Sequence, residues 1–218
     1  MLNYKEFVFG MGSGRCGTVS LAKLLNSQSN SNFEHESSPR LTWKFDKNQI
    51  NSKINNLKNL NEKYVGDVAF YYLPYVEHII SNHSNAKFVV LKRDKKETIN
   101  SFMKKTEGRN HWIIHDGKKW KKDKEWDDCF PKYDHVTKEK ALETYWEEYY
   151  KEVNRLLNKY PSNIKIWETE DLNSEEKVKE ILNFANISKE DQRIMVNIQE
   201  NKNSLLKSFK NLMIKLFR

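Results

Sequence analysis

The alternation of apolar and polar positions divides the chain into short strands and longer helices. Continuous apolar runs at Glu6–Met11, Val65–Tyr71 and Lys87–Lys92 are typical of strands buried inside a parallel sheet. Weaker strand patterns follow at 32–36 and 164–167. Amphipathic spacing between these runs predicts helices. The predicted helices are Thr18–Asn26, Phe45–Lys63, Pro74–Asn82, Lys95–Lys105, Lys138–Lys159 and Asn173–Phe184.

Strands that alternate with helices predict an α/β fold. We expect a three-layer, P-loop-like domain in which helices flank a central, mainly parallel sheet. The 218 residues are enough for one hydrophobic core, so a single domain over residues 1–218 is predicted. No internal repeat or low-complexity linker interrupts it.

A glycine-rich loop joins the first predicted strand to the first predicted helix in FVFGMGSGRCGTVSLAKLL, residues 7–25. A nucleotide-binding P-loop reads G-x-x-x-x-G-K-[ST]. Gly12 and Gly17 have this spacing, but Thr18 stands where the lysine would be. The N–H groups of such a loop converge on an anion, and Arg15 adds a cation with several donors. The sequence therefore predicts an anion site here, and the alternative is an ordinary glycine-rich turn.

A second candidate anion site follows the strand KFVVLK. Arg93 ends this strand, and Ser101 lies eight residues further on, in the next helix. Ligands of open α/β sheets bind at the carboxyl ends of the strands, so Arg93 and the glycine loop are predicted to share one edge. Two anion sites on one edge fit a nucleotide with phosphates at both ends. In the simpler alternative, Arg93 pairs with Asp94 or Glu97 on the surface.

The pieces GRCGTVSL, KRDKKETINS, ALETYWEEYYKEVNRLL and IKIWETEDLNSEEKVKEILNFANI occur in an order that resembles sulfotransferases using 3′-phosphoadenosine 5′-phosphosulfate (PAPS). The resemblance implies that the loop holds the 5′-phosphosulfate, and that Arg93 and Ser101 hold the 3′-phosphate. Arg15 stands where many members have lysine, and Cys16 replaces the usual serine. The loop residues assigned to the donor are Gly12, Ser13, Gly14, Arg15, Cys16, Gly17 and Thr18.

Sulfuryl transfer needs a base for the acceptor hydroxyl and a cation for the leaving phosphate. The segment NFEHESSPRLTW, just after the first helix, offers Glu34, His35 and Glu36, and similar enzymes often have His-Glu or a lone Glu there. We favour Glu36 as the base, with His35 next, and the alternative is a surface acidic loop. Arg15 is the candidate cation, and its contribution is electrostatic because arginine does not donate a proton.

The irregular segment 107–136 is predicted to face the acceptor. A long loop in a compact domain is usually functional or mobile. Its aromatic residues could cover a sugar ring, stack on single-stranded nucleic acid, or dock on the core. These residues are Trp112, Trp120, Trp126, Phe130 and Tyr133, and they lie among Lys118, Lys119, Lys121, Lys122 and Lys124.

The C-terminal stretch 203–217 places its apolar residues on one side of a predicted amphipathic helix, with lysines outside. Such a helix packs on its own domain or on a second subunit, giving a homodimer, or lies on an anionic membrane as a peripheral contact.

Charge and cysteine content narrow the picture further. The net charge of +8 favours anionic ligands without choosing among them. Cys16 and Cys129 form no disulfide framework or metal motif, and no signal peptide or membrane-length apolar run is found, so we expect a cytoplasmic protein. No metal is expected, because the i, i+4 spacing of His111 and His115 arises often by chance.

Two other functions compete with the sulfotransferase interpretation. The main rival is a P-loop kinase of small molecules that uses ATP and Mg²⁺, with Asp67 and Thr18 holding the metal. The missing loop lysine counts against it, and Arg93 with Ser101 would be left unexplained. A basic module that binds nucleic acid without catalysis explains the charge but not the two anion sites, so no nucleic-acid partner is expected.

Overall fold

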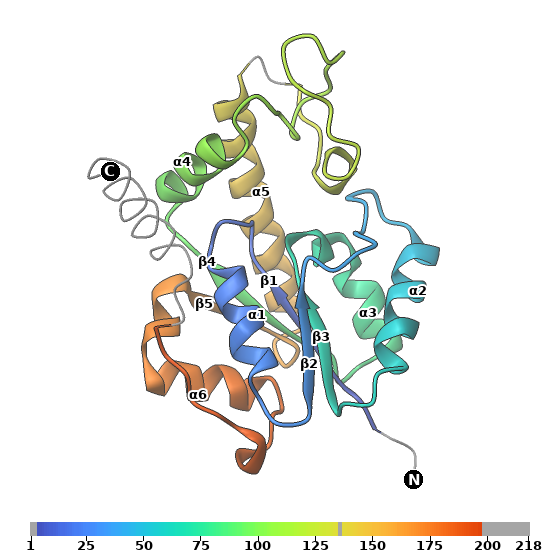
Figure 1. Ribbon diagram of the computed structural model, residues 1–218, viewed down its shortest axis with the longest axis vertical. Helices are drawn as coiled ribbons and strands as arrows, with labels where there is room; N and C mark the ends of the chain where they lie inside the picture. Colours follow the sequence, from blue (N-terminus) through green and yellow to red (C-terminus); the bar gives the residue numbers. More distant parts are fainter. Residues whose placement is uncertain (1–3, 135–136, 198–218) are drawn as a thin grey trace, which may run out of the picture.

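The computed structural model describes residues 4–134 and 137–197. A five-stranded sheet lies at its centre, and every strand runs parallel to its neighbours in the order β2-β3-β1-β4-β5 (Figure 1). The predicted α/β fold is thus confirmed, and the sheet is wholly parallel. The strands are β1 (Glu6–Met11), β2 (Ser31–His35), β3 (Tyr64–Val68), β4 (Lys87–Lys92) and β5 (Ile164–Glu168).

Helices cover both faces of the sheet (Figure 1). Helices α1 and α6 pack on one face, and α2, α3 and α5 pack on the other, which gives the three expected layers. The helices are α1 (Thr18–Asn26), α2 (Lys47–Lys58), α3 (Val76–Asn82), α4 (Lys95–Lys105), α5 (Lys138–Lys159) and α6 (Glu175–Phe184).

The strand pattern explains why both faces are buried. In β1, Phe7, Phe9 and Met11 point into the core beneath α2, α3 and α5, whereas Val8 points into the core beneath α1 and α6. Successive side chains of a strand alternate between faces, so a continuous apolar run feeds two cores at once. This arrangement fixes β1 at the centre and places its carboxyl end, with the glycine loop, in the middle of one sheet edge.

The aromatic run after β3 is the main departure from the predicted elements. The expected strand Val65–Tyr71 ends at Val68, and residues Phe70–Tyr75 form a 3₁₀ turn that leads into α3. The run is apolar enough for a buried strand, but the Tyr71 hydroxyl donates to the Asp67 carboxylate at 3.1 Å, which draws the chain back on itself. Helix α2 is also shorter than predicted: Asp46 accepts the N–H groups of Asn48 and Gln49 and so sets its start, and the helix ends at Lys58.

Three expectations concern regions beyond these elements. The predicted helix 203–217 lies outside the described residues, so its role in a homodimer or at a membrane stays a prediction. None of the helices within 4–134 and 137–197 combines the length and apolar character needed to cross a bilayer. Within the irregular segment 107–136, Trp112 and Phe130 are buried against the core, as the docking alternative expected.

Candidate active site

A cavity of about 680 Å³ opens at the carboxyl ends of the strands, within the size range of small-molecule sites. The strand order changes direction at β1, which pairs with β3 on one side and β4 on the other. Ligands of open α/β sheets bind at such a switch point. Strand-end residues that line the cavity are Gly14, Arg15, Gly17 and Thr18 after β1, His35 and Glu36 at the end of β2, Arg93 after β4 and Thr169 after β5.

Three tyrosines of α5 hold the glycine loop from behind. The Tyr145 hydroxyl donates to the Ser13 carbonyl at 3.0 Å. The Gly12 N–H donates to the Tyr149 hydroxyl at 3.2 Å, and the Ser13 N–H donates to the Tyr150 hydroxyl at 3.4 Å. All three tyrosines are buried. The loop is thereby fixed on its buried side, which leaves its other side to line the cavity. Sequence reasoning noted this helix but not its contacts with the loop.

The backbone of the loop is left-handed at Gly14, Arg15 and Gly17, with φ values of 85°, 58° and 87°. Arginine is rare in this region, and Glu36 shares it with a φ of 52°. The other described non-glycine residues with positive φ are asparagines, which tolerate it. Backbone strain of this kind persists only where the surrounding structure enforces it, and it gathers at functional sites.

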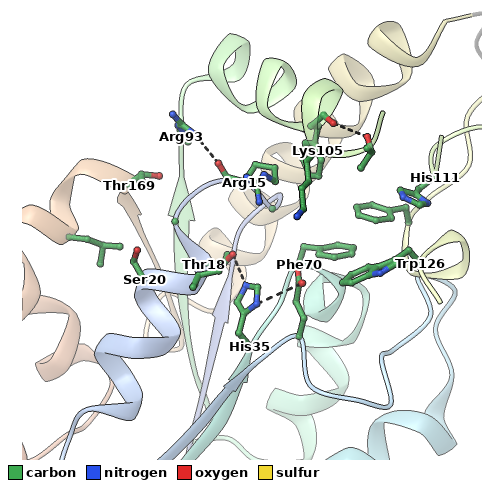
Figure 2. Close-up of a pocket in the computed structure, with 18 of the residues that line it drawn as sticks. Arg15, Thr18, Ser20, His35, Phe70, Arg93, Lys105, His111, Trp126 and Thr169 are labelled. Atoms are coloured by element: carbon green, nitrogen blue, oxygen red, sulfur yellow. Dashed lines mark hydrogen bonds and ion pairs between the residues drawn. The ribbon is translucent and has the colours of Figure 1, made fainter. Parts of the chain in front are cut away.

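The two predicted anion sites meet in one cluster. The Arg15 Nε–H donates to the Ser101 hydroxyl at 3.0 Å. An Arg93 N–H donates to the Arg15 carbonyl at 3.2 Å (Figure 2). Arg93 also pairs with Glu97 at 2.7 Å, as the simpler alternative expected. Burial is the largest effect on Arg15 and lowers its pKa, but a guanidinium stays charged at any physiological pH. The cluster therefore presents two permanent cations beside the loop.

The base candidates lie beside the start of α1. His35 Nε2 and the Thr18 hydroxyl are 3.0 Å apart, and His35 Nδ1 lies 3.8 Å from a Glu36 carboxylate oxygen (Figure 2). Burial raises the pKa of Glu36 to about 7, and the negative charge of Asp67 acts in the same direction. Burial lowers the pKa of His35, which keeps its ring neutral at pH 7. A carboxylate that titrates near neutrality is suited to general-base catalysis.

A fully buried ion pair supports the segment that carries Glu36. The Asp67 carboxylate accepts the Ser37 N–H at 3.3 Å and lies 3.4 Å from the Lys53 ammonium. Lys53 in turn donates to the Ser37 carbonyl at 2.7 Å. Both backbone polar groups of Ser37 are thus held, and Ser37 directly follows Glu36. No sequence pattern pointed to Lys53, because it lies on the otherwise polar helix α2.

A family model described as a sulfotransferase domain matches residues 7–171, which is most of the chain. The chain belongs to the sulfotransferase family. Its fold is similar to that of a solved sulfotransferase from Alicyclobacillus acidocaldarius, with 13% identity, a TM-score of 0.55 and coverage of 94% of this chain and 91% of that one.

A second similar structure is that of the mouse sulfotransferase SULT7A1 complexed with PAP. It has 15% identity and a TM-score of 0.54, and the match covers 86% of this chain and 61% of the mouse chain. At these identities the likeness shows the fold alone. No curated protein sequence matches this chain.

Some predicted donor residues of this sulfotransferase lie behind the cavity rather than in its lining. Gly12, Ser13 and Cys16 are fully or almost fully buried, and Ser101 lies beside Arg15. Burial raises the pKa of Cys16 to about 11, so its thiol is protonated and packs as an apolar group. Any contact that these three loop residues make with a donor would come from their backbone.

Two cavity residues carried no recognisable sequence signal. The Thr169 hydroxyl contacts the carbonyls of Cys16 at 2.9 Å and Lys92 at 3.1 Å, which ties the end of β5 to the loop and to β4. Lys105, on the last turn of α4, points into the cavity beside Arg15 (Figure 2). Threonine and lysine are common, and only the folded sheet edge brings these two to the site.

Stacked aromatic rings form the wall of the cavity farther from Arg15 and Arg93. The centroids of Phe70 and Phe130 are 4.2 Å apart with ring planes at 13°, and Phe70 and Trp126 are 6.3 Å apart at 22°. We call these three residues the aromatic wall. Figure 2 shows Phe70 and Trp126 across the cavity from Arg15. Of the residues predicted to face an acceptor, Trp126 and Phe130 do line the cavity.

Proposed function

We propose that this sulfotransferase moves a sulfuryl group from PAPS to the hydroxyl group of a small-molecule or glycan acceptor, and releases 3′,5′-adenosine bisphosphate (PAP). The observation that carries the proposal is the convergence of Arg15, Arg93 and Ser101 on one side of the cavity that Glu36 also lines. A donor with phosphates at both ends needs the first group, and a hydroxyl acceptor needs the second. The mouse sulfotransferase of similar fold is a complex with PAP, and this nucleotide agrees with the donor that we propose.

The donor side of the cavity fits a doubly phosphorylated nucleotide. The first N–H groups of α1 have no acceptor within the helix, and Gly17 and Thr18 stand where it begins. The positive end of the helix dipole adds to Arg15 at this point. Arg93 would exchange the Glu97 carboxylate for the 3′-phosphate, with Ser101 as the second donor.

In the proposed reaction, a bond forms between the acceptor oxygen and sulfur while the bond between sulfur and the nucleotide phosphate breaks. Glu36 takes the acceptor proton, and the leaving phosphate gains a negative charge. Arg15 stabilises that charge electrostatically, most strongly in the transition state. His35 holds the Thr18 hydroxyl in place beside Glu36.

The kinase alternative loses support at Asp67. Its carboxylate is fully buried, accepts hydroxyl hydrogen bonds from Tyr71 and Tyr72, and pairs with Lys53. Asp67 is not among the described residues that line the cavity, so it is poorly placed to hold Mg²⁺ against a nucleotide. Among residues 4–134 and 137–197, no cluster of three or more histidine, cysteine or acidic side chains is arranged to hold a metal ion.

Calorimetry tests the proposal directly. PAP should bind without Mg²⁺, and ATP should bind more weakly with or without it. Arg93→Ala should weaken PAP far more than 5′-AMP, whereas Arg155→Ala, which removes a surface arginine paired with Glu152, should change neither. Preferred, Mg²⁺-dependent binding of ATP would refute the sulfotransferase proposal in favour of a kinase. Equal losses for PAP and 5′-AMP would show that Arg93 does not read the 3′-phosphate.

A further inference from the structure

A second histidine lines the cavity at the far end of the aromatic wall. His111 is 3% exposed, and its ring stacks on Phe130 with centroids 5.6 Å apart and planes at 16°. Phe130 stacks on Phe70 in turn. Figure 2 shows Phe70 lying between His35 and His111. His111 is therefore remote from the proposed base, and the transfer step as described does not use it.

Asp127 fixes which nitrogen of His111 carries the proton. One Asp127 carboxylate oxygen lies 2.8 Å from His111 Nδ1, and the other accepts the Asp123 N–H at 2.7 Å. An ionised carboxylate only accepts hydrogen bonds, so Nδ1 must be the protonated nitrogen. Burial, the largest effect, lowers the pKa of His111, so the ring is neutral at pH 7 and Nε2 keeps its lone pair.

The pair of His111 and Asp127, which we call the dyad, is also rigid. The Lys132 ammonium donates to the His111 carbonyl at 2.6 Å and to the Asp127 carbonyl. The residues that supply the two side chains are thus tied together through their backbone as well. A preorganised acceptor of this kind discriminates between ligands, because a ligand without a matching donor leaves a buried polar atom unpaired.

We infer that the acceptor is a flat ring compound whose reacting hydroxyl faces Glu36 and whose second, remote hydroxyl donates a hydrogen bond to Nε2 of His111. The aromatic wall covers one face of the ring between these two ends. This inference rests on the proposed function for the reacting end only. The dyad and the wall would select such a ring whether or not the bound nucleotide is competent for transfer, so binding can be tested apart from transfer.

The test is calorimetric titration of ring compounds into the PAP-saturated full chain. PAP binding is measured first, before any ring compound is added, and its failure would count against the proposed function. The probes are 2,6-dihydroxynaphthalene and its monomethyl ether, 6-methoxy-2-naphthol. The diol can donate at both ends and the ether at one only, so we expect the diol to bind about tenfold more tightly, as about 1.4 kcal/mol predicts.

Asp127→Asn is the decisive variant, because it is isosteric and reverses the polarity of His111. The Asp123 N–H should hold the amide oxygen, so the amide NH₂ group faces Nδ1 and forces the ring proton onto Nε2. Nε2 then donates, and the methoxy oxygen becomes a good partner. The ether should gain affinity while the diol keeps its own, and the tenfold preference should fall to about one.

His111→Phe keeps the stacking and removes both nitrogens, so the preference should vanish through loss of diol affinity. His115→Phe, on the same segment but outside the cavity lining, should leave it intact. An absent preference in the wild type, or one unchanged in both Asp127→Asn and His111→Phe, would overturn the inference. Methyl β-cellobioside, whose rings are puckered, is the second arm: if it binds more tightly than the naphthalene diol, the assignment of a flat ring is overturned.

Discussion

The raised pKa of Glu36 gives a pH profile that a base with an ordinary carboxyl pKa would not show. With a pKa of about 7, the carboxylate is about one-tenth ionised at pH 6 and about nine-tenths at pH 8. If Glu36 takes the acceptor proton, kcat/KM should rise about tenfold across this interval and then level off. An ordinary glutamate, with a pKa near 4.3, would give a flat profile over the same range.

The assay is transfer from labelled PAPS at fixed ionic strength, between pH 5.5 and 8.5. Glu36→Gln should lower kcat/KM by about 10²–10⁴-fold and abolish the ascending limb. Glu34→Gln is the matched control, because Glu34 lies on β2 two residues earlier and is exposed. An unchanged limb in Glu36→Gln would refute the assignment. A limb that lies below pH 6.5 would point to His35, whose pKa burial lowers.

The same pKa predicts an effect on stability with a definite sign. A carboxyl whose pKa rises on folding binds its proton more tightly in the folded state, so the free energy of unfolding falls as the pH increases from about 4.5 to 7. The full shift corresponds to about 3 kcal/mol. Glu36→Gln should therefore be more stable than the wild type at pH 8 by a few kcal/mol and nearly equal to it at pH 4.5, measured by urea unfolding. If the wild type and Glu36→Gln were equally stable at both pH values, burial would not raise the pKa of the Glu36 carboxyl.

Three further substitutions test separate parts of the site. Glu97→Gln removes the carboxylate that pairs with Arg93, and such an exposed ion pair is worth about 0–1 kcal/mol. PAP affinity, measured by calorimetry, should therefore rise up to about fivefold. A loss of affinity would mean that Glu97 helps to position Arg93. Lys53→Met leaves Asp67 buried without its cation and should cost about 3–5 kcal/mol in urea unfolding, with Lys58→Met as the exposed control. Thr169→Val removes the hydroxyl contacts to two carbonyls, so the free energy of unfolding should fall by about 1–3 kcal/mol and PAP should bind more weakly. A loss of PAP affinity without a loss of stability would argue against a bracing role for Thr169.

Elements whose pattern carries its own physical signal could be predicted well. Helix α4 has the predicted bounds, and its start is set by Asp94, which accepts the Glu97 N–H as the capping signature requires. Helix α5 follows from its long amphipathic repeat. The run after β3 was misjudged because apolar periodicity does not record that Tyr71 hydrogen-bonds back to Asp67.

The parts of the candidate site that lie within one local motif could be predicted from residue spacing. The contacts between segments that are distant in the sequence could not. Glycine spacing and the strand end indicated the loop and Arg93. The contact between Arg15 and Ser101 joins residues 86 positions apart, and Lys53 reaches Ser37 from a helix that looks like an ordinary surface element. These contacts follow from the order of strands in the sheet, which single-sequence periodicity does not specify.

The loop of this sulfotransferase has no lysine at its end, and the contacts around it explain how an anion site can be built without one. A P-loop lysine is a flexible point charge that reaches the phosphates from the helix start. Here the cation is Arg15, within the loop itself, held in a left-handed conformation and anchored to Ser101. Tyrosines fix the loop from behind, and Thr169 fixes it from the side. Because Arg93 also bonds to the Arg15 backbone, the positions of the two predicted phosphate sites are mechanically linked, so disturbing either one should shift the other.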